Sequence, residues 1–153
     1  MFIVYGFGAI VAILIGSSAA MIHASGHAPV GLVSIGVGAA LGAIYNSIAV
    51  WRGVQRGRSF VLSTIVLAIL TVLSEHDCLY LDFCRQWRES RENSPQVAMF
   101  RPEAPLSLME YLEYQWSPQR AAFWCLDAAL ITASAVGTVV VLSKAPQPPV
   151  PSP

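Results

Sequence analysis

The chain has 153 residues, of which 55% are hydrophobic and 12% are charged, and its formal net charge is zero. Soluble domains carry about 25% charged residues, so this chain has too few to cover a globular surface. Lys144 is the one lysine beside eight arginines, and such a chain has no basic field, which argues against a nucleic-acid partner. The composition therefore predicts that the main partner is the lipid bilayer.

Four apolar stretches reach or approach the length that crosses about 30 Å of hydrocarbon. They cover residues 2–22, 30–50, 59–76 and 121–142. The third is the shortest, and it runs into the ionisable cluster Glu75-His76-Asp77-Cys78. The sequence thus predicts an all-α fold: an antiparallel four-helix membrane bundle over residues 1–143, with a partly helical outer cap at 77–120 and a proline-rich tail at 144–153.

The first apolar stretch also has one feature of a secretory signal, because residues 16–20 are all small. However, no positive charge precedes it, and its apolar part is longer than the usual 7–15 residues of such a signal. We therefore expect this stretch to be a retained membrane helix.

The distribution of positive charge predicts the orientation in the membrane. Arg52, Arg56 and Arg58 crowd the short connection between the second and third stretches, and Lys144 follows the fourth. Short loops rich in arginine and lysine lie on the cytoplasmic side. Both termini are therefore expected in the cytoplasm, with loops 23–29 and 77–120 on the outer side.

Small residues mark the second stretch as a packing helix. Gly38 and Gly42 form a GxxxG motif, and small residues four apart let two membrane helices approach closely. We expect close packing of the first and second helices, with another chain as the alternative partner of the motif. Asn46, near the inner end of the same helix, is expected to make an interhelical hydrogen bond; a transport role is the alternative.

The outer cap contains local helix signals. No glycine or proline occurs between Leu79 and Arg88, so the third helix is predicted to project outward until Asn93-Ser94-Pro95 breaks it. Residues 94–106 contain three prolines and are predicted to be irregular. Ser107 and Glu110 fit a capping box that starts a short aromatic-rich helix at the outer interface. Ser117-Pro118 is predicted to start the fourth span.

The three cysteines, Cys78, Cys84 and Cys125, lie on the side predicted to be outer, and an oxidising exterior favours a structural disulfide. If Cys78 and Cys84 share one helix, they differ by roughly 9 Å of rise and lie on different faces, which is beyond bridging distance. In that case one of them pairs with Cys125; otherwise the helix is broken. The chain has no Cys-x-x-Cys motif, which argues against a catalytic thiol.

Nitrogen and sulfur donors gather at the outer rim. His23, His27, His76 and Cys78 lie close to the predicted outer helix ends, and such donors suit zinc or copper. Two histidines from different helices can also flank a haem. No known motif supports either site, so we expect no cofactor, with a metal ion or haem as the alternative.

Asp127 is the one acid well inside a predicted span. A carboxylate at that depth is costly, so it should face the bundle or a cavity, with His23, His76 or Arg120 within reach as partners. We expect a packing role, with proton or ion handling as the alternative.

The four-span plan with one large outer loop resembles that of tetraspan proteins in topology alone, since their Cys-Cys-Gly signature is absent. Nucleotide-binding loops, HExxH motifs and serine-hydrolase signatures are also missing. We expect a non-catalytic accessory subunit that stabilises a larger multi-subunit membrane complex. The alternatives are a redox or metal-bearing protein that uses the rim residues, and a small oligomeric channel or transporter built around Asp127 and Asn46.

Overall fold

The computed structural model describes residues 2–24, 31–55, 57–93 and 104–144, and all regular structure within these ranges is α-helical. The helices are α1 (Phe2–Ala24), α2 (Leu32–Trp51), α3 (Arg58–Asn93), α5 (Leu108–Gln115) and α6 (Pro118–Lys144). Four of them, α1, α2, α3 and α6, are long and apolar enough to cross a membrane. The predicted helical class and four membrane-length helices are thus confirmed. His27 and residues 145–153 of the predicted tail lie outside the described residues.

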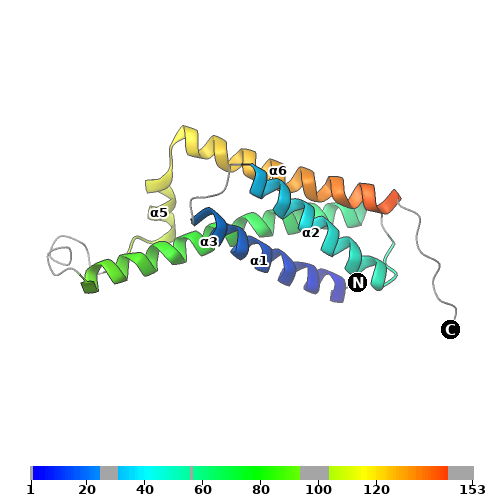
Figure 1. Cartoon of the computed structure of the whole chain (residues 1–153), viewed down its shortest axis with the longest axis horizontal. Helices are drawn as coiled ribbons and strands as arrows, with labels where there is room; N and C mark the ends of the chain where they lie inside the picture. The colour runs from blue at the N-terminus through cyan, green and yellow to red at the C-terminus, as the bar shows by residue number, and fades with distance from the viewer. Residues whose placement is uncertain (1, 25–30, 56, 94–103, 145–153) are drawn as a thin grey trace.

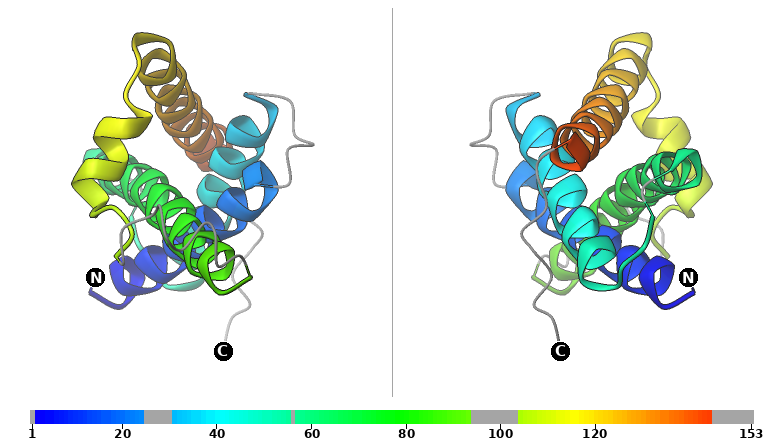
Figure 2. Two further views of the ribbon diagram at one scale, coloured as in Figure 1. Left: turned by 90° about the vertical axis from the view of Figure 1, so that its left-hand side faces the viewer. Right: turned by 90° about the vertical axis from the view of Figure 1, so that its right-hand side faces the viewer.

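Successive long helices run in opposite directions along the molecule, so α1 begins and α6 ends at the same end (Figure 1). The most extensive contacts join α1 to α3 and α2 to α6, as the end-on views show (Figure 2). Within each of these pairs the two helices run parallel: Gly8 of α1 faces Leu67 of α3, and Gly16 faces Thr71 further along both helices. The closest pairs therefore join helices that are not neighbours in the chain.

Each long helix buries one narrow stripe and leaves its remaining apolar surface exposed. Tyr45 lies at the centre of the core, fully buried, with its ring stacked on Phe60 at 4.6 Å. The opposite faces carry side chains such as Leu62 (63% exposed) and Val141 (69% exposed). Exposed apolar surface of this extent is rare on water-facing monomers and fits helices surrounded by lipid.

Helix α3 is much longer than a membrane crossing requires. Its 36 residues extend roughly 54 Å at 1.5 Å per residue, against about 30 Å of hydrocarbon. The excess carries polar contacts on its exposed surface, where Asp82 accepts hydrogen bonds from Arg85 at 2.6 Å and from Gln86 at 2.7 Å. The helix ends at Asn93, as predicted, and projects beyond the other helices (Figure 1).

Local capping interactions start the next two helices. The Ser107 hydroxyl accepts a hydrogen bond from the Glu110 backbone, and the Glu110 carboxylate accepts from the Ser107 backbone at 2.8 Å. The bonds from the Ser107 side chain and backbone lower the pKa of Glu110. At α6, the Ser117 hydroxyl accepts from the backbone of Arg120 at 3.2 Å. Both predicted helix starts are confirmed.

Aromatic rings join α5 to the projecting part of α3. The Tyr111 ring lies 5.5 Å from that of Tyr80 and 4.9 Å from that of Phe83, measured between centroids. The Tyr80 hydroxyl also donates to the Leu106 carbonyl at 2.9 Å. Helix α5 therefore spans the space between the α3 projection and the beginning of α6 (Figure 1).

Candidate functional site

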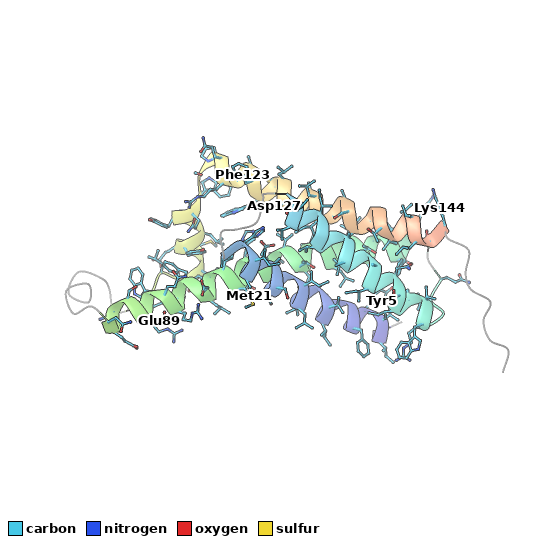
Figure 3. All side chains as sticks on the ribbon, in the orientation of Figure 1. Tyr5, Met21, Glu89, Phe123, Asp127 and Lys144 are labelled. Carbon is cyan, nitrogen blue, oxygen red and sulfur yellow. The ribbon has the colours of Figure 1, made fainter. Side chains whose placement is uncertain are left out.

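A small cavity lies between α1, α3 and α6, near the end at which α3 leaves the other helices. Its volume is about 90 Å³, and four ionisable side chains line it: His23, Glu75, His76 and Asp127. The remaining wall is mainly apolar and consists of Val72, Leu79, Trp124 and Ile131. We call this space the polar cavity. Figure 3 shows the position of Asp127 on α6, beside the beginning of α2.

The first feature of the polar cavity is a bond between α1 and α3. His23 Nδ1 lies 2.5 Å from Glu75 Oε1, and Glu75 is only 7% exposed. Gly16 permits this contact, because a Cβ at that position would collide with the Thr71 carbonyl oxygen. The close approach of the two backbones two turns away thus gives the buried carboxylate the partner that it needs.

A matching bond joins α2 to α6. The buried Ser34 hydroxyl donates to Asp127 Oδ1 at 2.7 Å. Gly38 and Gly42 follow Ser34 at intervals of four residues, and a Cβ at Gly42 would lie 2.5 Å from the Ala135 carbonyl oxygen. The GxxxG motif therefore packs on α6, whereas we predicted the first helix or another chain as its partner. Close backbone contact again positions a carboxylate.

The predicted partners of Asp127 have other contacts. His76 places its ring edge against Trp124, with centroids 5.1 Å apart, and Arg120 donates to Gln115. His23 and His76 nevertheless line the same cavity as Asp127. The structure thus brings these histidines near Asp127 but bonds its carboxylate to Ser34.

Of the four candidate metal ligands, His23 and His76 line the polar cavity, and His27 lies outside the described residues. Cys78 does not line the polar cavity; its thiol donates to the Ser17 hydroxyl of α1 at 3.2 Å. In the part of the chain that the structure describes, no group of three histidine, cysteine or acidic side chains is arranged to hold a metal ion. The cavity between His23 and His76 is also far too small for a porphyrin, so the residues present do not fit a haem.

The structure does not support the predicted disulfide. Cys78, Cys84 and Cys125 are all free thiols. Since α3 is continuous through Cys78 and Cys84, about 9 Å of helical rise separates them. The remaining candidate, Cys125, is exposed on α6, whereas Cys84 is buried.

Asn46 does not belong to the polar cavity. It is 7% exposed, and its side-chain oxygen finds no hydrogen-bond partner within the described residues. It follows Ser34 by twelve positions along α2, which places it roughly 18 Å from the bond to Asp127. A site shared by Asn46 and Asp127 within one chain is therefore not formed.

Two residues of the site, Glu75 and Ser34, were not among the predicted site residues. Glu75 follows Thr71 by four residues and Ala68 by seven, and both of those are fully buried. Ser34 precedes the glycines of the GxxxG motif at the same spacing of four. Extending each buried stripe by one helical turn would have found both residues.

A second surface of interest lies on the outward side of α6. Ala129, Ala133 and Gly137 follow one another at intervals of four residues, and all three are exposed. A Cβ at Gly137 would meet nothing within 4 Å. We call this surface the outer small-residue face.

Comparison of the chain with protein-family models, with curated proteins and with solved structures finds no match. The polar cavity and the outer small-residue face are therefore the features from which a function can be argued.

Proposed function

We propose that the protein is a non-catalytic membrane subunit that packs against another membrane protein through the outer small-residue face of α6. The observation that supports this is the exposed face formed by Ala129, Ala133 and Gly137. Lipid gives apolar helices no hydrophobic drive to associate, so association depends on close packing, which small residues allow. Small residues already allow such packing within the chain, where Gly38 and Gly42 let α2 pack closely on another face of α6.

In this proposal the four long helices cross the bilayer as a bundle with alternating directions and with both termini in the cytoplasm. Arg52 and Arg58 lie at the connection between α2 and α3, and Lys144 ends α6. The α2–α3 connection and the end of α6 lie at the same end of the molecule (Figure 1), which supports placing that end in the cytoplasm. The α3 projection and α5 are then on the outer side.

The orientation predicts a labelling pattern along α3. Arg58→Cys and Glu89→Cys place single thiols at exposed positions towards opposite ends of this helix, in a chain whose three native cysteines are replaced by alanine. A membrane-impermeant maleimide added to intact cells should label Glu89→Cys, and should label Arg58→Cys only after permeabilisation. The reverse pattern would invert the orientation, and labelling of both from one side would show that α3 does not cross.

If the outer small-residue face contacts the partner, a bulky side chain on this face should weaken the complex. Gly137→Leu should weaken the complex roughly tenfold, equivalent to about 1.4 kcal/mol, because a large side chain holds the partner helix away. The measurement is the fraction of the chain that migrates above its own mass on native gels of mildly solubilised membranes. Mass spectrometry of the band identifies the partner or shows a second copy of this chain.

Gly6→Leu is the matched control for this experiment. Gly6 is also exposed, and a Cβ there meets nothing within 4 Å, but it lies on α1. This variant should leave the complex intact. Migration of the unaltered protein as a single chain, or equal loss in the Gly6 and Gly137 variants, would refute the proposal.

A further inference from the structure

We propose that the polar cavity is a proton-binding site, in which an exchangeable proton is shared through water between the His23–Glu75 pair and Asp127. This goes beyond the proposed role as a subunit and does not depend on it. The proposal rests on the convergence of two buried or partly buried carboxylates and two imidazoles, from three helices, on one small space.

The size of the cavity suits small ligands. A volume of about 90 Å³ leaves room for a few water molecules. Water also fits the lining, because Glu75, His76 and Asp127 offer it polar partners while the rest of the wall is mainly apolar. The ligands of the site in this proposal are water and the proton.

The His23–Glu75 contact is a hydrogen bond. His23 Nδ1 and Glu75 Oε1 lie 2.5 Å apart, so one of the two atoms carries the proton that the bond requires. The His23 side chain is 25% exposed, against 9% for Glu75. His23 is thus the member of the pair through which protons can exchange with the solution.

Asp127 supplies a second place for the proton. In the transfer, an O–H bond of the Glu75 carboxyl breaks as cavity water accepts its proton, and water passes a proton to Asp127, where a new O–H bond forms. Glu75 ends as a carboxylate and Asp127 as a carboxylic acid, so charge is conserved.

The groups that face the cavity come from every helix packed around it. Helix α1 contributes His23, and α3 contributes Glu75 and His76. Helix α6 contributes Asp127 and the uncharged ring of Trp124. Helix α2 does not line the cavity, but its uncharged Ser34 hydroxyl donates to Asp127.

The test is infrared difference spectroscopy of the full chain in lipid bilayers during a pH titration, with the proton itself as the probe. We expect a protonated-carboxyl band that shifts in D₂O. Glu75→Gln and Asp127→Asn should each remove one part of this band and shift the part that belongs to the other carboxyl, because the two carboxyls share one proton site. Asp77→Asn, which alters an exposed carboxylate two residues from Glu75, should remove only the signal of an exposed carboxyl and should not shift the bands of Glu75 and Asp127.

Isotope labelling of the unaltered protein keeps the test decisive if a variant fails to fold. Carbon-13 aspartate should move part of the protonated-carboxyl band, and carbon-13 glutamate should move another part. A protonated-carboxyl band that is the same in the unaltered protein, in Glu75→Gln and in Asp127→Asn would overturn the proposal, because it would come from exposed carboxyls, which protonate at acid pH. So would a glutamate band that does not respond to Asp127→Asn.

Discussion

Gly38→Ala is expected to destabilise the protein by about 2–3 kcal/mol, although it adds only one methyl group. The added Cβ would collide with the Ile131 carbonyl and the Ser134 hydroxyl. A backbone carbonyl cannot rotate away, so α2 and α6 would have to separate along their length. Thermal or denaturant unfolding in bilayer-like particles measures the loss.

Gly36→Ala is the matched control for this prediction. Gly36 lies on the same helix two residues earlier, and a Cβ there meets nothing within 4 Å. Alanine is favoured over glycine in a helix by up to about 1 kcal/mol, so this variant should be as stable as the unaltered protein or more stable. Equal destabilisation by both variants would contradict the close parallel contact of α2 with α6.

Glu75→Ala is expected to destabilise the protein by about 2 kcal/mol, because it leaves the mostly buried His23 ring nitrogen without its partner. The bond joins residues 52 positions apart on α1 and α3, so its loss loosens one of the two closest helix pairs. Unfolding measurements on His23→Ala, Glu75→Ala and the double variant isolate the coupling between the two side chains.

The exposed neighbour Asp77 provides the comparison for Glu75. Asp77→Ala removes a carboxylate from the same helix, but at an exposed position, and should change stability by less than about 0.5 kcal/mol. A coupling near zero in the His23 and Glu75 cycle would mean that the bond does not stabilise the fold. If Asp77→Ala destabilised the protein as much as Glu75→Ala, the loss of stability would come from the change in net charge and not from the bond to His23.

Together these variants test a common arrangement of the two parallel pairs. In each pair, glycines allow close backbone contact, and a carboxylate one turn away on the partner helix forms a hydrogen bond. Glu75 lies one turn after Thr71, which Gly16 contacts, and Asp127 lies one turn before Ile131, which Gly38 contacts. Both carboxylates then line the polar cavity. The packing that stabilises the bundle is therefore the same packing that assembles the proposed proton site.

The sequence by itself determined the features that depend on neighbouring residues. Four apolar stretches of sufficient length determined the membrane-length helices, because hydropathy and length are local properties. Ser107 with Glu110, and Ser117 with Pro118, determined two helix starts, because a cap is formed within one turn.

Only the tertiary structure decided which helix faces meet. A GxxxG motif such as that of Gly38 fits any face of small residues equally well, so its partner depends on the energies of all possible pairings at once. The bonds of Glu75 to His23 and of Asp127 to Ser34 follow from that choice. The exposed position of Cys125 on α6 is likewise a property of the assembled bundle, in which the three cysteines are free.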